Sequence, residues 1–125
     1  MKNRLLKIIR LIKIPLLAFA NLQAILKNKG HEVEYLDGES VSKQYDLVVV
    51  NGSIIDYHNE TAVCQKIKNQ YSQTKVIVFG SFPSARPDLF DAADSVIVGD
   101  ELYFFLKEFT GLENLSKIIR AQGKV

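Results

Sequence analysis

Three short apolar runs, each of which stops at a glycine turn, constrain the fold of this chain most strongly. Residues 45–50 read Tyr-Asp-Leu-Val-Val-Val and break at Asn51-Gly52-Ser53, residues 75–79 break at Gly80-Ser81, and residues 95–98 break at Gly99-Asp100. A nearly continuous apolar run of this length, ended by turn-forming residues, is typical of a strand buried on both faces, as in a parallel sheet. The pattern predicts three central strands of an α/β domain.

Two further segments are candidates for strands of the same sheet. Residues 31–36 alternate Val33 and Tyr35 with Glu32 and Glu34, which predicts a strand near an edge with one wetter face. Residues 5–12 are the remaining candidate for a first strand, and although their pattern fits a helix equally well, we expect a short strand. The sheet is therefore expected to have four to five strands.

Helical segments separate the predicted strands. One follows Pro15 and ends at Gly30, since proline suits a first helical position and glycine a helix end. A second carries apolar side chains at every fourth position over residues 63–71, with Asp56 or Asn59 as its cap.

A third helix is predicted for residues 102–109, between a capping Asp100 and a terminating Gly111, and a short last helix for residues 112–119. Strands that alternate with helices imply right-handed crossovers and a three-layer, doubly wound parallel sheet. We expect a flavodoxin-like or Rossmann-like α/β fold in a single domain over residues 1–125, because 125 residues suit one domain.

The single cysteine limits the chemistry of the chain. With Cys64 alone, no intramolecular disulfide, self-contained iron–sulfur cluster or multi-cysteine zinc site can form, and a cytoplasmic location is expected. The balance of 47% hydrophobic and 24% charged residues is that of an ordinary globular protein.

The net charge of +2 is unevenly distributed, with seven basic residues and no acidic residue in the first thirty positions. Such a basic, apolar start is typical of a targeting peptide or a membrane-surface helix. The charges at Arg4, Lys7, Arg10 and Lys13 interrupt the apolar run too often for a membrane span. Contact of residues 1–20 with a membrane surface stays open, as does the oligomeric state, and no nucleic-acid partner is expected.

The ends of the three central strands are where a ligand is expected. In an open parallel sheet, ligands bind beyond the carboxyl ends of the strands, where backbone amides and helix N-termini converge. The candidate ligand-binding residues are Asn51, Gly52, Ser53, Gly80, Ser81, Phe82, Pro83, Gly99, Asp100 and Glu101. Gly80 either lets a ligand approach the backbone or is a plain turn residue, and Ser53 either donates to a ligand or caps the next helix.

Known sites on related folds are excluded by missing residues. Neither the phosphate-binding Gly-x-x-x-x-Gly-Lys-Ser/Thr loop nor the dinucleotide-binding Gly-x-Gly-x-x-Gly fingerprint occurs. A phospho-acceptor receiver domain needs acidic residues after the first strand and an aspartate after the third. Here no acidic residue precedes Pro15, and position 51 is Asn.

Two histidines and one acidic pair are the remaining candidates for chemistry. His31 is expected to be a solvated residue at a strand boundary, whereas His58 either faces the crevice or has a surface or capping role. Asp100 and Glu101 either transfer protons or complement a helix dipole. A small enzyme that uses His58 with Asp100 or Glu101 is the weakest hypothesis, since no catalytic triad and no metal site is evident.

Residues 15–37, 45–53, 76–87 with Gly80-Ser81-Phe82-Pro83, and 96–101 with Val-x-x-Gly-Asp-Glu follow one another along the chain. This succession of segments resembles the cobalamin-binding domain that precedes the catalytic domain in many radical SAM enzymes. Residues 15–37 resemble its first helix and second strand, and residues 45–53 its third strand. Residues 76–87 resemble the Gly-Gly-x-x-Pro loop of that family, residues 96–101 its Val-x-x-Gly-Glu-Gly-Glu segment, and residues 112–125 its tail before the catalytic domain.

The resemblance implies that the strand ends hold the corrin ring or the nucleotide tail of cobalamin, and that a radical SAM protein is the partner. It implicates Ser53, Gly80, Ser81, Phe82, Pro83, Gly99 and Glu101 in ligand contact. The sequence also departs from the family. The cobalt-ligating Asp-x-His-x-x-Gly loop is absent, and Ser81 replaces the second glycine of the Gly-Gly pair.

The Cys-x-x-x-Cys-x-x-Cys cluster motif is absent too, so we expect no iron–sulfur cluster and no catalysis by this chain alone. The alternative expectation is a ligand-free protein-interaction or membrane-surface domain that uses the basic, apolar N-terminal segment.

Overall fold

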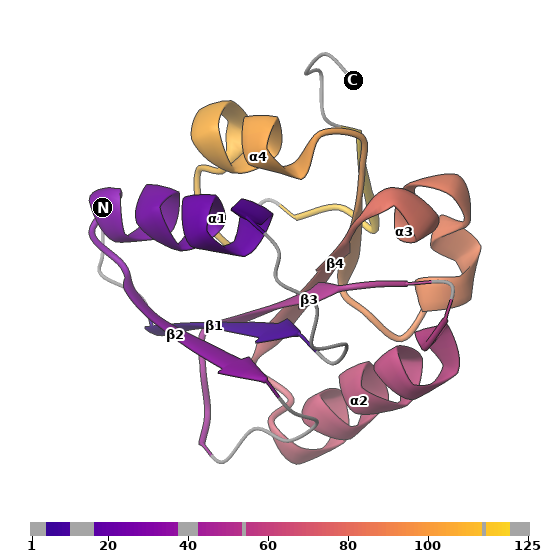
Figure 1. The fold of residues 1–125 in the computed structure, drawn as a ribbon. Coiled ribbons are helices and arrows are strands. Elements are labelled where there is room, and N and C mark those ends of the chain that lie inside the picture. Colours follow the sequence, from indigo (N-terminus) through magenta and orange to yellow (C-terminus); the bar gives the residue numbers. More distant parts are fainter. Residues whose placement is uncertain (1–4, 11–16, 38–42, 54, 114, 121–125) are drawn as a thin grey trace.

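Six parallel strands form one sheet in the computed structural model, which describes residues 5–10, 17–37, 43–53, 55–113 and 115–120 (Figure 1). The strands are β1 (Leu5–Arg10), β2 (Glu32–Asp37), β3 (Leu47–Asn51), β4 (Lys75–Phe79), β5 (Ser95–Val98) and β6 (Ile118–Arg120). Their order across the sheet is β2-β1-β3-β4-β5-β6, and every neighbouring pair is parallel. This order confirms the predicted flavodoxin-like, doubly wound fold.

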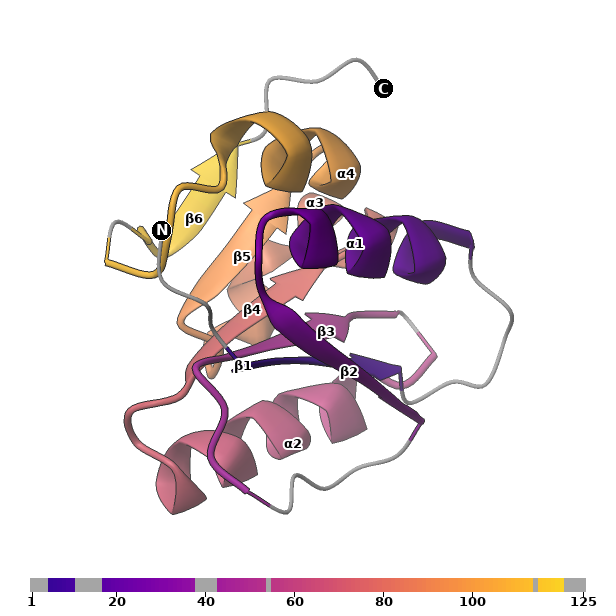
Figure 2. The same cartoon turned by 90° about the vertical axis from the view of Figure 1, so that its left-hand side faces the viewer.

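Helices cover both faces of the sheet, with α1 and α4 on one face and α2 on the other (Figures 1 and 2). The α-helices are α1 (Leu17–Asn28), α2 (Tyr57–Gln70), α3 (Ser81–Ala85) and α4 (Glu101–Tyr103). A 3₁₀-helix η1 (Pro87–Phe90) follows α3, and a π-helical turn η2 (Phe104–Glu108) continues α4. Within the described residues, no helix has the length and apolar character needed to cross a membrane.

The two faces of the sheet bury two separate hydrophobic cores, as alternating side chains of a strand require. Leu47 and Val49 of β3 pack in one core with residues of α1 and η2. Val48 and Val50 of the same strand pack in the other core with residues of α2 and η1. A strand that is apolar at every position is thus explained by helices on both faces, which confirms the three-layer prediction.

The first strand settles whether the N-terminal segment is a strand or a helix. β1 lies between β2 and β3, with Ile8 in register with Tyr35 on one side and with Val49 on the other. The predicted first strand is therefore confirmed for residues 5–10, and its last two positions lie outside the described residues. β2 is the edge strand, as predicted, with Val33 buried and Glu32 exposed.

The helix predicted for residues 112–119 was wrong, because this part of the chain adds β6 to the other edge of the sheet (Figure 2). Leu112, Leu115 and Ile119 have helix-like spacing, and all three pack against the core that contains α1. The free edge of β5 supplies backbone partners that residues 118–120 take up, and this pairing takes the place of the helix. The sheet consequently has one strand more than the four to five expected.

His31 was predicted to be solvated, and this was wrong. Only 5% of the residue is exposed, and its ring lies 6.1 Å from the ring of Phe109. The chain that follows η2 passes over the start of β2, and this contact between distant segments buries a residue that local sequence places at a boundary.

Candidate functional site

Two adjoining pockets open at the carboxyl edge of the three central strands. The first has a volume of about 500 Å³ and is lined by Gly80, Ser81, Ser84, Val98, Gly99, Asp100 and Glu101. The second has a volume of about 360 Å³ and is lined by Asn51, Gly52, Ser53, Gly80, Ser81, Phe82 and Glu101. Nine of the ten predicted residues line one pocket or both, since the carboxyl ends of neighbouring parallel strands meet at one edge.

Pro83, the tenth predicted residue, lies beneath the pockets rather than in their walls. It is buried in α3, and its Cγ lies 2.4 Å from where a Cβ on Gly52 would stand. The ring of Phe90 lies 2.9 Å from the same point. There is therefore no room for a side chain at position 52, because α3 and η1 pack against the end of β3. The packing of the chain explains this glycine without a ligand.

Gly80 is required by its backbone as well as by its neighbours. Its φ of +131° lies in a region that residues with a side chain rarely adopt, and a Cβ there would stand 2.9 Å from the carbonyl oxygen of Gly52. The chain turns at Gly80 from β4 directly into α3, so a short helix stands where the resemblance implies a loop.

Ser53 neither caps α2 nor points freely into the second pocket. Its backbone N–H donates to Glu60 Oε1 at 2.7 Å, and its hydroxyl donates to Glu60 Oε2 at 3.1 Å. The same hydroxyl accepts from the backbone N–H of Asp56 at 3.2 Å. Glu60 is 1% exposed, and burial raises its pKa to about 6 although the hydrogen bonds from Ser53 lower it.

Glu60 and Ser84 shape the site and were missed by sequence reasoning. Ser84 accepts a hydrogen bond from the Gly99 N–H at 3.1 Å and so connects α3 to the end of β5. A glutamate in the first turn of a helix and a serine in a short loop are both common on protein surfaces. The sequence therefore carries no signal that would have distinguished either residue.

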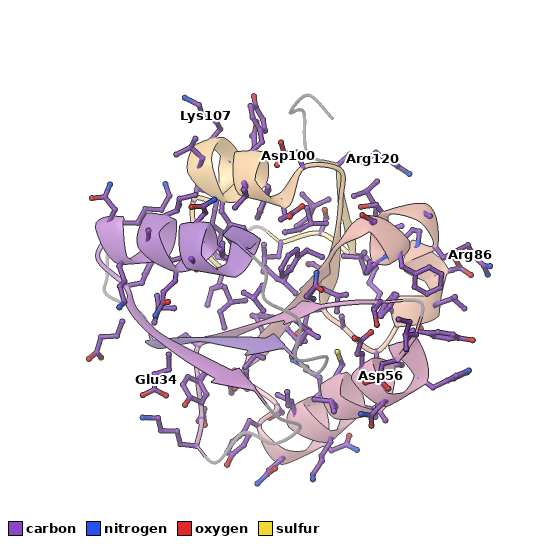
Figure 3. All side chains as sticks on the ribbon, viewed as in Figure 1. Glu34, Asp56, Arg86, Asp100, Lys107 and Arg120 are labelled. Atoms are coloured by element: carbon purple, nitrogen blue, oxygen red, sulfur yellow. The ribbon has the colours of Figure 1, made fainter. Side chains whose placement is uncertain are left out.

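The acidic pair has two different roles. Asp100 caps α4 as predicted, because its side chain accepts from the backbone N–H of Tyr103 at 3.1 Å. Glu101 lines both pockets, and its pKa is raised by burial and by the neighbouring charge of Asp100. Figure 3 shows Asp100 at the top of the view and Asp56 below it at the start of α2.

The pockets are acidic. Their described lining includes the carboxyl groups of Asp100 and Glu101 and no Lys, Arg or His side chain. His58 is exposed and stacks on Tyr57 with 4.0 Å between ring centroids, and the described lining of neither pocket includes it. Among the described residues, no group of three or more His, Cys, Asp or Glu side chains is placed to hold a metal ion.

The fold has a known counterpart. The chain is similar to the crystal structure of a response regulator from Thermotoga maritima, with a TM-score of 0.65 and 14% sequence identity over 85% of this chain and 93% of that one. At this identity the likeness shows the flavodoxin-like fold alone. No protein-family model and no curated protein matches the sequence.

Proposed function

We propose that this chain is a non-catalytic ligand-binding domain whose ligand is a corrinoid, held at the carboxyl edge of β3, β4 and β5. The observation that carries the proposal is that nine of ten residues chosen from strand ends and from the cobalamin-domain resemblance line two adjoining pockets. Volumes of about 500 and 360 Å³ lie in the range of small-molecule sites.

The charge of the pocket lining favours binding of the corrin ring over binding of the nucleotide tail. Two carboxyl groups without a basic side chain in the described lining disfavour phosphate and favour groups that donate hydrogen bonds. The edge of a corrin ring carries neutral amide side chains that can donate to Glu101, whereas the nucleotide tail carries a phosphate. A corrinoid is larger than either pocket, so the ring edge would enter and the rest would lie over α3 and α4.

The residues present fit a corrinoid that has no protein ligand on its cobalt. The described residues place no histidine in the pockets, and the sequence lacks the family's cobalt-ligating loop. Ser81, Gly99 and Glu101 would then hold the corrinoid through contacts to its periphery. The cofactor would supply organocobalt chemistry to a partner enzyme, and this chain would bind and orient it.

Equilibrium dialysis against hydroxocobalamin, with gel filtration of the mixture, tests the proposal. Ser81→Trp should abolish retention of the corrinoid, because Ser81 is exposed and lines both pockets. Ser72→Trp is the matched control, since Ser72 is exposed between α2 and β4, at the opposite edge of the sheet. No retention by the wild-type protein, or equal retention by the two variants, would overturn the proposal.

The proposed partner is a radical SAM protein, to which this chain would supply its domain in trans. Affinity purification of the tagged chain from its native cells should bring down a polypeptide with the Cys-x-x-x-Cys-x-x-Cys motif. Recovery of the chain without such a polypeptide would remove the partner from the proposal. The cytoplasmic location predicted from the single cysteine belongs to the same proposal.

A second candidate is a protein-interaction or membrane-surface domain that binds no ligand. It is favoured by Gly52 and Ser53, whose space and hydrogen bonds are taken up by Pro83, Phe90 and Glu60 within the chain. Removing the first fourteen residues is not a clean test, because β1 is an inner strand of the sheet. Lys2→Glu with Arg4→Glu spares β1 and should abolish binding to anionic vesicles if this candidate is correct. Unchanged vesicle binding, or none in the wild type, would reject the membrane-surface role.

A further inference from the structure

A buried carboxyl group lies behind the wall of the second pocket. Glu60 stands in the first turn of α2, is 1% exposed, and accepts hydrogen bonds from both the N–H and the hydroxyl of Ser53. Ser53 itself lines the pocket, at the end of the segment that leaves β3. Glu60 is not part of the described pocket lining and is connected to it by these hydrogen bonds to Ser53.

The hydroxyl of Ser53 has one proton and two lone pairs to distribute. Its proton is donated to Glu60 Oε2, and one lone pair accepts from the N–H of Asp56. While Glu60 is ionised it can only accept, so the Ser53 proton stays directed at Glu60. In this arrangement the Ser53 hydroxyl has one lone pair left and no proton to give a ligand.

We propose that Glu60 is a positioning residue that sets the hydrogen-bonding direction of Ser53 and thereby couples binding in the second pocket to the uptake of one proton. A proton taken up on Glu60 Oε2 makes that oxygen a donor to Ser53 Oγ, while Oε1 continues to accept from the Ser53 N–H. The Ser53 proton then turns into the pocket, where a ligand acceptor can take it. The coupling rests on the proposed ligand-binding function, whereas the positioning of Ser53 does not.

The surroundings of Glu60 place this change in mildly acidic solution. Burial and, to a smaller extent, the negative charge of Asp56 raise the pKa of Glu60, the hydrogen bonds from Ser53 lower it, and the result is a pKa of about 6. Cys64, one turn along α2, has a pKa raised to about 12 by burial and stays neutral. Beyond it, Asp94 is paired with Lys68 at 3.0 Å, and from η1 the apolar residues Leu89 and Phe90 pack on this face.

Nuclear magnetic resonance of the ligand-free protein tests the positioning. The Ser53 amide resonance should shift with an inflection near pH 6 in the wild type, because its acceptor titrates at about that pH. Glu60→Gln should abolish this inflection, since a carboxamide accepts from the Ser53 N–H and donates to Ser53 Oγ at every pH. Glu101→Gln should retain the inflection, and it is the control for Glu101, the other carboxyl group whose pKa is raised. An inflection that persists in Glu60→Gln, or is absent from the wild type, overturns the positioning role.

Binding of cyanocobalamin at pH 5 and pH 7.5 tests the coupling. Glu101 also has a raised pKa and lines the same pocket, so the pH comparison is made in a Glu101→Gln background, which keeps a hydrogen-bond acceptor at that position. This background should bind about fivefold more tightly at pH 5, which is the worth of about one hydrogen bond. Adding Glu60→Gln should give the tighter level at both pH values, and adding Ser53→Ala the weaker level at both. Equal binding by the background protein at the two pH values overturns the coupling. Absence of binding by the wild type at both pH values overturns the ligand proposal instead, and leaves the resonance result to decide the positioning of Ser53.

Discussion

Two strand-to-helix connections at the carboxyl edge of the sheet contain similar residues with different roles. The β3–α2 connection has Gly52, Asp56 at the start of its helix, and Glu60 within the first turn. The β5–α4 connection has a glycine, Asp100 at the start of its helix, and Glu101 directly after it. In each, a buried strand ends at a glycine and an acidic residue begins a helix.

The two connections differ in where their polar groups are directed. In the first, the space at Gly52 is filled by Pro83 and Phe90, and Ser53 is bonded to Glu60. In the second, the carboxyl group of Glu101 lines both pockets. The comparison teaches that the β3–α2 connection is filled and hydrogen-bonded by side chains of the chain itself, whereas the β5–α4 connection presents a carboxyl group to the pockets.

The largest expected difference between the connections is at their glycines. Gly52→Ala should lower the free energy of unfolding by about 3 kcal/mol, because the new Cβ would stand 2.4 Å from Pro83 Cγ. Gly99→Ala introduces the strain of a φ of +108° and should cost about 1 kcal/mol. Urea denaturation of both variants measures the difference, and equal losses would mean that the β3–α2 connection is no more tightly packed than the other.

The second difference concerns the pH dependence of stability. The pKa of Glu60 is raised in the folded state from 4.5 to about 6, so its stabilising contribution is complete below pH 4.5 and is lost as the pH rises through 6. The free energy of unfolding should therefore fall by about 2 kcal/mol over this range, and Glu60→Gln should remove that fall. Glu101 has a raised pKa too and acts with the same sign, so the comparison belongs in a Glu101→Gln background. If the free energy of unfolding falls equally in Glu60→Gln, the pH dependence comes from a group other than Glu60.

The smallest expected difference is at the two aspartates that begin helices. Asp100→Ala should cost about 1 kcal/mol, because it removes the acceptor for the Tyr103 N–H. Asp56→Ala should change stability by less than about 0.5 kcal/mol, since the Asp56 side chain makes no capping hydrogen bond to α2. Thermal denaturation of the two variants distinguishes them, and a larger loss at Asp56 would contradict the assignment of the caps.

Much of the fold was predictable because its signals are local. β4 and β5 have the bounds that their apolar runs and glycines predicted, and Asp100 caps its helix as expected. The gathering of nine candidate residues at two pockets follows from the same signals, since parallel strands carry their carboxyl ends to one edge. The corrinoid, the radical SAM partner and the membrane-surface alternative remain predictions.

What could not be predicted depends on contacts between distant segments. β6 forms because β5 leaves an open edge, and His31 is buried because the chain near Phe109 covers it. The local sequence at either position does not indicate that a distant segment of the chain will pack there.

The most informative feature of the sequence is the set of glycine turns after the buried strands. These strands and turns by themselves determined a parallel sheet with covered faces and a polar carboxyl edge. They did so because side-chain alternation and backbone freedom are local properties. Only the tertiary structure decided that Pro83 and Phe90 pack against Gly52. It alone also decided that Glu60 is buried against Ser53 while Glu101 lines both pockets, because burial is set by neighbours that the chain brings together from far apart.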